Sequence, residues 1–300
     1  MIFGSIAILL VLVVIGITLF LNLAPQFGAS KKAIRTEQVL NSPNYMEGEF
    51  ENIENTVTMT DFKLSTVPKF FSNGDNKTPD FLLPVEKIEA SQIRRIEDSL
   101  TRVTWFGHST FLLETAGKAI LIDPMLGNVP APIAWAGSPR FTTELPISAE
   151  DLPFIDAVLI SHDHYDHLDY GSILKLKDKV GMFYAPLGVG AHLRAWGVDP
   201  DKVIELDWWD KGSFDEFTFV ATPARHFSGR GMFDRNCTQW CSWIIRTDDV
   251  NIFFSGDGGY GKHFKEIGDK YGPFDFAMME CGQYNEQLSL IHISEPTRQV

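Results

Sequence analysis

The feature that most constrains this chain is a run of metal-binding side chains directly after an apolar segment. Residues 157–160 read Ala-Val-Leu-Ile, and His162, His164, Asp166 and His167 follow at once. On a strand, His162 and His164 would share one face, because side chains repeat every second residue, and a turn would fold the other two back toward it. Imidazole nitrogen and carboxylate oxygen both suit zinc. A solvated polar turn is the alternative, but three of the eight histidines lie here.

Size and charge narrow the class of protein. The 300 residues suggest one large domain or two small ones, and a hydrophobic content of 44% is enough for a sizeable core. The net charge of -13 argues against nonspecific binding to nucleic acid, which depends on Lys and Arg neutralising phosphates. A phosphate-containing substrate stays open, because bound divalent cations would dominate the local field.

The cysteines do not form a disulfide framework. Cys237, Cys241 and Cys281 are an odd number, and they contain no C-x-x-C pair. We expect them to be small core residues, with a ligand role for Cys241 as the alternative.

The N-terminus carries an apolar run over residues 2–22. As a helix it would be about 31 Å long, enough to cross the hydrocarbon core of a bilayer. A cleaved signal peptide would need basic residues before the run and a shorter apolar core. We therefore predict a single-pass transmembrane anchor over 1–24. Lys31, Lys32 and Arg35 follow the run, so the positive-inside rule places the rest of the chain in the cytoplasm.

The pattern of strands and turns predicts a strand-rich α/β domain from residue 101 onward. Residues 25–100 are polar and mixed, and we read them as a linker and an N-terminal extension that packs on the main domain. Helices are expected at 171–179 and 188–196. Short β-branched and aromatic runs alternate with turn residues at 102–105, 110–114, 119–122, 157–161, 182–185, 217–222, 242–246, 252–255 and 276–279.

Several of these strands lead into a polar residue. Runs 119–122, 157–161, 217–222 and 252–255 lead to Asp123, His162, His226 and Asp257, respectively. An Asp in a Gly-rich turn is often only a turn former, and an isolated His is often a core residue. In a chain that already has a His/Asp cluster, we expect one site along the edge where these strand ends converge.

Together these residues resemble the metallo-β-lactamase superfamily, whose signature is H-x-H-x-D-H. More narrowly, the chain resembles the N-acyl phosphatidylethanolamine phospholipase D group and its bacterial relatives. The resemblance covers residues 100–287 and implies a metallo-β-lactamase-like αββα sandwich with two metals at one edge. The matching stretches include RVTWFGHST at 102–110, SHDHYDHLDY at 161–170 and TPARHFSGR at 222–230, with shorter ones at 122–124, 208–209, 233–236, 256–257, 264–268 and 272–275.

The resemblance implies two divalent metal ions, with zinc as the expected element. It assigns six residues to them: His162, His164 and His226 to the first metal, Asp166 and His167 to the second, and Asp257 between the two. A metal pair about 3.5–4 Å apart activates a shared water and clamps the attacking and leaving oxygens of a phosphodiester. A metal-bound hydroxide is therefore the expected nucleophile.

Two further roles follow from the resemblance. Asp166 could also orient that hydroxide, and Tyr165 faces either the substrate or the packed strand beside it. Hydrogen-bond partners should fix the tautomers of the histidine ligands. The candidates for this outer role are His108, Asp123 and Asp169.

The end of the chain departs from the family pattern. The family has one more His on the second metal, supplied by a late strand. Residues 288–298 instead resemble the conceptual translation of a sequencing adapter, so His292 is not taken as that ligand. We expect 101–287 to be an incomplete hydrolase domain and 288–300 to be a non-native tail.

The leading functional hypothesis is a membrane-anchored phosphodiesterase of the phospholipase D type that acts on phospholipid headgroups. Another hydrolase on the same fold, a lactonase or a nuclease, is the first alternative, although the acidic charge weighs against a nuclease. A non-catalytic membrane-anchored protein or an inactive fragment is the second. The intact H-x-H-x-D-H motif favours an enzyme.

Overall fold

The computed structural model describes residues 2–56, 79–94, 97, 100–133, 135, 137–142 and 144–281. The predicted non-native tail at 288–300, including His292, lies outside the described residues.

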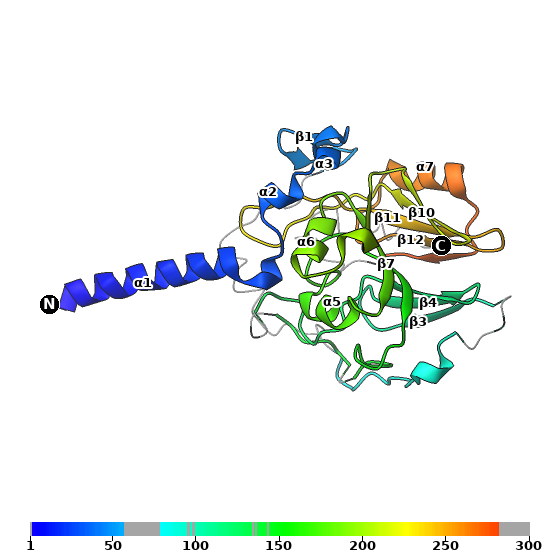
Figure 1. The fold of residues 1–300 in the computed structure, drawn as a ribbon, viewed down its shortest axis with the longest axis horizontal. Coiled ribbons are helices and arrows are strands. Elements are labelled where there is room, and N and C mark those ends of the chain that lie inside the picture. Colours follow the sequence, from blue (N-terminus) through cyan, green and yellow to red (C-terminus); the bar gives the residue numbers. More distant parts are fainter. Residues whose placement is uncertain are drawn as a thin grey trace.

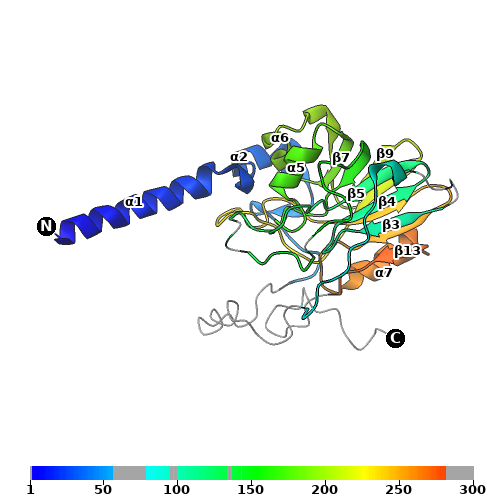
Figure 2. The ribbon, with the colours of Figure 1, turned by 90° about the horizontal axis from the view of Figure 1, so that it is seen from below.

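Two β-sheets stack face to face in the described part of the chain (Figures 1 and 2). The first has the strand order β3-β4-β5-β6-β7-β8, with bounds Arg102–Trp105, Phe111–Thr115, Lys118–Ile122, Ile155–Leu159, Val180–Pro186 and Val203–Leu206. The second has the order β13-β12-β11-β10-β9, with bounds Phe276–Met278, Asn251–Phe254, Ser242–Arg246, Phe217–Thr222 and Lys211–Phe214. Strands β5 to β8 run parallel, whereas β9 to β12 pair antiparallel.

Alternation along the strands creates the layers. On β5, Ile120 and Ile122 face the second sheet, whereas Ala119 and Leu121 face the opposite side. The inner cluster joins both sheets, and helices α5 (Tyr170–Leu176) and α6 (Gly190–Ala195) cover the outer face of the first sheet. Helix α7 (Lys262–Tyr271) covers the outer face of the second through Ile267. The expected αββα arrangement is therefore confirmed.

The N-terminal extension packs on this sandwich. Its described elements are α1 (Ile2–Leu23), η1 (Pro25–Phe27), α2 (Lys31–Ile34), α3 (Glu37–Asn41) and the hairpin β1 (Tyr45–Met46) to β2 (Glu49–Phe50). Val39 and Phe50 are fully buried in the cluster between the two sheets. Residues 31–50 thus belong to the folded body; the remaining short helices are η3 (Ala90–Gln92) and η5 (Pro200–Lys202).

Helix α1 stands away from the sandwich, and its large apolar side chains from Ile8 to Leu19 are exposed (Figure 1). Taking only the residues that the structure describes in full, no single helix meets the length and hydropathy of a membrane span. The segments Ile8–Leu23 and Pro25–Ile34, bent by 53° relative to each other, meet them as a pair.

In the two sheets and the helices that cover them, strands β8 and β9 and helix α7 were not expected from the sequence. In the N-terminal extension, α2, α3 and the hairpin of β1 and β2 were not expected either. Strand β8 carries a Glu in the run Val-Ile-Glu-Leu, so its apolar signal is short. Helix α7 follows Gly261, contains Gly268, and has charged side chains at five of its ten residues, so only its thin apolar stripe marks it as a helix.

Candidate metal centre

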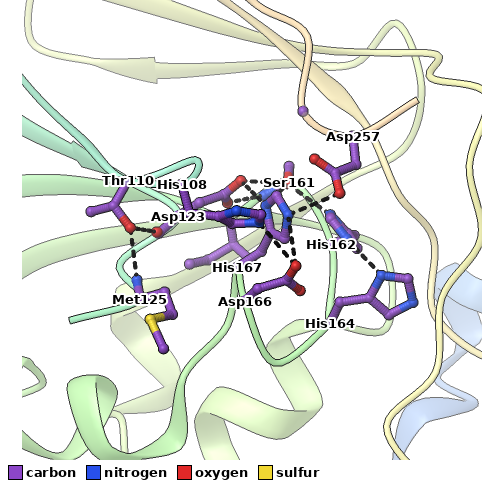
Figure 3. Close-up of polar contacts among 12 residues, drawn as sticks. His108, Thr110, Asp123, Met125, Ser161, His162, His164, Asp166, His167 and Asp257 are labelled. Carbon is purple, nitrogen blue, oxygen red and sulfur yellow. Dashed lines mark hydrogen bonds and ion pairs between the residues drawn. The ribbon is translucent and has the colours of Figure 1, made fainter. Parts of the chain in front are cut away.

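The six predicted metal ligands converge at one edge of the sandwich, and Figure 3 shows five of them: His162, His164, Asp166, His167 and Asp257. Asp123 follows β5, and the stretch from His162 to His167 follows β6 of the same sheet. His226 follows β10, and Asp257 follows β12 of the other sheet. Both sheets therefore contribute side chains to one rim.

The turn after β12 requires glycine at one position. Gly256 has φ +58°, and a Cβ there would lie 2.8 Å from the Cys241 carbonyl oxygen. A larger residue would push the turn that carries Asp257 away from the neighbouring strand. Cys241 itself is buried in the core between the sheets and Cys237 is buried as well, as expected for small core residues, whereas the same expectation for Cys281 is wrong because that residue is exposed.

Three imidazoles form the first donor group, which consists of His162, His164 and His226. Nε2 of His162 lies 2.9 Å from Nδ1 of His164, and Nε2 of His226 lies 3.2 Å from the same atom. Donors on a tetrahedral zinc at 2.0–2.1 Å are about 3.3 Å apart. The three nitrogens thus already have roughly the spacing that one zinc ion would impose.

A second donor group lies beside the first and consists of His108, Asp166, His167 and Asp257. Nε2 of His167 lies 3.2 Å from Oδ2 of Asp257 and 4.0 Å from Oδ2 of Asp166. Nε2 of His108 lies 2.9 Å from Oδ2 of Asp166. The rings of His162 and His167 are 4.1 Å apart between centroids, so the two groups are immediate neighbours. This set of nitrogen and carboxylate donors suits a divalent cation.

The electrostatics of the first group favour metal binding. Burial, and then the neighbouring histidines, lower the pKa of His162 well below its usual value. Burial also lowers the pKa of His164. Both rings are therefore neutral at pH 7, which is the form that binds a metal.

The second group concentrates negative charge around one ring. Burial favours neutral His167, but Asp257, Asp166 and Asp123 together raise its pKa well above the usual value. Burial would likewise raise the pKa of Asp257, yet the charge of His167 holds that pKa below its usual range. Three carboxylates around one imidazole are stabilised by a nearby cation. A divalent metal ion carries more positive charge than a protonated imidazole ring, so it would stabilise them more strongly.

Asp123 lies behind the ring of His167, on the side away from Asp166 and Asp257. Its side chain is fully buried and accepts hydrogen bonds from His167 Nδ1 at 2.7 Å, Ser161 N at 2.6 Å and Ser161 Oγ at 2.6 Å. With Nδ1–H donating to Asp123, Nε2 of His167 points toward Asp166 and Asp257.

The other expected outer residues have different contacts. His108 pairs with the carboxylate of Asp166 and not with a nitrogen of a histidine ligand. Asp169 caps α5, where its side chain accepts from the backbone N and the hydroxyl of Ser172. An acidic residue at a helix N-terminus satisfies exposed backbone N–H groups, so the N-cap explains this residue without a role at the metal centre.

The structure also gives Tyr165 a contact that the sequence did not predict. Its hydroxyl donates to the Arg230 carbonyl at 2.7 Å, and the Arg230 guanidinium lies over its ring at 4.2 Å. Burial raises its pKa to about 12. The hydroxyl therefore stabilises the loop that contains Arg230, and this geometry does not support a catalytic role for Tyr165.

Two residues that support the centre were missed. Asn52 pairs with the backbone of His226 on both sides, since Nδ2 donates to the carbonyl at 2.7 Å and Oδ1 accepts from the amide at 3.0 Å. Buried Arg230 donates from Nη1 to the carbonyls of Asp163 and Leu168, at 2.6 and 2.8 Å. Both contacts cross more than 60 residues of sequence, so no local pattern marks them.

Comparison with known proteins agrees with this geometry. A beta-lactamase superfamily domain matches residues 118–297. The chain belongs to the metallo-β-lactamase superfamily. With its two groups of candidate metal ligands, it is a metal-dependent hydrolase of that superfamily.

Three relatives illustrate its place within the metallo-β-lactamase superfamily. An uncharacterised protein of Mycobacterium tuberculosis is 40% identical over 89% of this chain and 71% of its own length. The N-acyl-phosphatidylethanolamine-hydrolyzing phospholipase D 1 of Caenorhabditis elegans is 33% identical over 70% of this chain and 61% of its own length. The crystal structure of an isothiocyanate hydrolase from Delia radicum gut bacteria superposes with a TM-score of 0.50 and 25% identity, covering 64% of this chain and 76% of that one.

Proposed function

We propose that this protein is a metal-dependent phosphodiesterase that hydrolyses phospholipid headgroups, with the reaction type of an N-acyl phosphatidylethanolamine phospholipase D. The observation that carries the proposal is the pair of adjacent donor groups, linked by the 4.1 Å ring contact of His162 with His167. Two neighbouring divalent ions suit an in-line displacement at phosphorus, because they stabilise both the attacking and the leaving oxygen. The named activity of the nematode relative supports the choice of substrate.

Six residues would hold the ions: His162, His164 and His226 one of them, Asp166 and His167 the other, and Asp257 both. When bound, the ions, for which the nitrogen-rich donors favour zinc, lower the pKa of a water and withdraw charge from the phosphate. Burial would raise the pKa of Asp166, but the charge of His167 lowers it, so this carboxylate is ionised and can orient the attacking water. Asp123 keeps the ring of His167 in the tautomer that leaves Nε2 for the metal.

Helix α1 is proposed to be the membrane anchor of the enzyme. Its large apolar side chains from Ile8 to Leu19 are roughly half exposed or more, which is unfavourable in water but expected in a lipid phase. The basic Lys31 and Lys32 lie eight and nine residues after the last residue of α1, so the catalytic domain would lie on the cytoplasmic side. An anchored enzyme meets its lipid substrate without leaving the membrane.

The decisive experiment uses the full-length chain, loaded with zinc and reconstituted in vesicles that contain an N-acyl phosphatidylethanolamine. In water enriched in oxygen-18, attack at phosphorus puts one label into the phosphatidic acid and none into the released alcohol. We expect that labelling pattern with the parent protein and no turnover with His164→Ala. The Tyr165→Phe variant, which keeps every proposed ligand, should remain active.

The position of the label, together with a parallel assay on a lactone, distinguishes the proposed reaction from the alternative functions. Label in the released alcohol would mean attack at carbon and would overturn the proposed reaction. Turnover of an acyl lactone in a parallel assay, without any attack on the phospholipid, would identify the protein as a lactonase. Metal binding without turnover of either substrate would favour a non-catalytic role.

A further inference from the structure

Two loops contact the segment of residues 24–30 that connects α1 to the sandwich, which we call the N-terminal arm. The first loop includes residues 129–133 and Trp135, and its Pro132 carbonyl accepts from Gln26 Nε2 at 2.9 Å. The second, residues 229–235, contacts the same residue, because Nε and Nη2 of Arg230 donate to the Gln26 carbonyl at 3.1 and 2.8 Å. Both loops therefore flank the point where α1 leaves the body. In Figures 1 and 2 the second loop, coloured yellow, lies on the α1 side of the molecule.

These loops present large apolar side chains to the outside. Trp135 is 84% exposed, Phe233 is 78% exposed and Met232 is 69% exposed. Solvent exposure of three such side chains, on two loops that both contact Gln26, is unfavourable in water, so it indicates a partner surface. Aromatic residues are also the usual anchors at the boundary between lipid and water.

The second loop is held firmly in place. Arg230 is buried, and besides Gln26 it binds the carbonyls of Asp163 and Leu168, which lie in the stretch that carries the candidate metal ligands. Asp234 accepts from the amides of Arg230 and Gly231, which closes the loop on itself. Met232 and Phe233 therefore project from a fixed support.

Basic side chains follow Gln26 closely along the chain. Lys31 and Lys32 are exposed on α2, five and six residues after Gln26. In a protein of net charge -13, a pair of lysines this close in sequence to the residue that contacts both loops is suited to anionic lipid headgroups.

We propose that Trp135, Met232 and Phe233, together with the lysines of α2, form a membrane-contact surface that sits in the headgroup region of an anionic bilayer. This inference rests on the anchor role of α1 in the proposed function. A bilayer that contains α1 must lie next to both loops, because Gln26 touches each of them. The surface also borders the metal centre, since the Phe227 ring lies edge-on to His164 at 4.7 Å and Arg235 lies over Phe227 at 4.7 Å. Lipid headgroups seated there lie beside the donor residues.

Photochemical cross-linking of the full-length chain tests this surface. The photoreactive analogue p-benzoylphenylalanine replaces one residue at a time in protein reconstituted in vesicles of phosphatidylethanolamine and phosphatidylglycerol. We expect lipid adducts, measured by mass spectrometry, from positions 135 and 233. A matched position is Phe276, which is 47% exposed on β13, at the end of the molecule away from α1 in Figure 2, and it should give far less adduct.

Position 12, in the middle of α1, separates this inference from the anchor assignment. Adducts from position 12, but none from 135 and 233, would overturn the contact surface and leave the anchor in place. If position 12 also gave no adduct, the anchor itself would be refuted, and the surface with it. In a second measurement, adduct yield from position 233 should fall several-fold when phosphatidylglycerol is omitted; an unchanged yield would remove the lysines from the surface.

Discussion

Nδ1 of His167 donates a hydrogen bond to Oδ2 of Asp123 over 2.7 Å, and both side chains are completely buried. The charge of Asp123 raises the basicity of the ring whose other nitrogen faces Asp257. Loss of such an outer partner typically weakens metal binding about 10- to 100-fold. We therefore expect Asp123→Asn to lower zinc affinity by that factor, measured by competition with a chromophoric chelator.

Asp169→Asn is the matched control, because it makes the same chemical change shortly after His167 in the same stretch of chain. Its carboxylate caps α5, so the variant should lose about 1 kcal/mol of stability or less and keep its zinc affinity. Equal affinity losses in the two variants would show that the effect is general and not due to the bond with His167.

Asn52 links the N-terminal extension to a candidate ligand, since it pairs with both backbone groups of His226 and accepts from Trp240 Nε1 at 3.2 Å. Asn52→Ala removes these hydrogen bonds from the backbone of buried His226, which costs about 1–3 kcal/mol. We expect lower stability in urea and weaker zinc binding. The exposed neighbour Glu51→Ala should change neither; an Asn52→Ala protein with parental zinc affinity would contradict the support role.

Gly28 is required for close approach of the arm to α6. Its φ is +79°, and a Cβ would lie 2.0 Å from Nδ1 of His192, the atom that accepts from the Ala29 amide. Gly28→Ala should cost about 3 kcal/mol, from backbone strain plus overpacking. Gly117→Ala, at φ +68° with no atom within 4 Å of the added Cβ, should cost about 1 kcal/mol from strain alone. Comparable losses in thermal denaturation would argue against a tight contact with His192.

The lowered pKa of buried His263 predicts that the protein loses stability as the pH falls. Burial lowers its pKa to about 4 from the usual 6.5, so the unfolded chain takes up the proton first as the pH falls. Stability is therefore unaffected by this residue above pH 6.5 and decreases between 6.5 and 4. From about pH 7 to about pH 5, the parent protein without metal should lose about 2 kcal/mol more than His263→Gln, measured by urea denaturation. Parallel pH curves for the two proteins would exclude this residue as the source.

The sequence predicted the parts of the site that are compact along the chain. His162 to His167 lie within six residues, and His226 and Asp257 each follow an apolar strand, so the convergence of strand ends predicted one site at one rim. Asp123 was found for the same reason. The αββα layers were predicted from the family resemblance alone.

The contacts that were missed depend on distant residues. Arg230 and Asn52 bind backbone carbonyls and amides, and backbone groups leave no trace in the sequence pattern. The cap that Asp169 provides was also missed, although its signal was local: Asp169 lies three residues before Ser172 at the start of α5, which is an N-cap pattern. Helix α7 was missed because its buried stripe consists of few residues on a charged helix.

The candidate ligands come from both sheets, with His162 following a strand of one and His226 and Asp257 following strands of the other. A bound metal would therefore fasten the two halves of the sandwich at one rim, and an unfolded chain could not reproduce that arrangement. At a free metal concentration of about 100 times the Kd, metal binding to the folded state raises the free energy of unfolding by about 2.7 kcal/mol. The supply of metal in the cell would thus govern how long the protein survives proteolysis, as well as whether it is active.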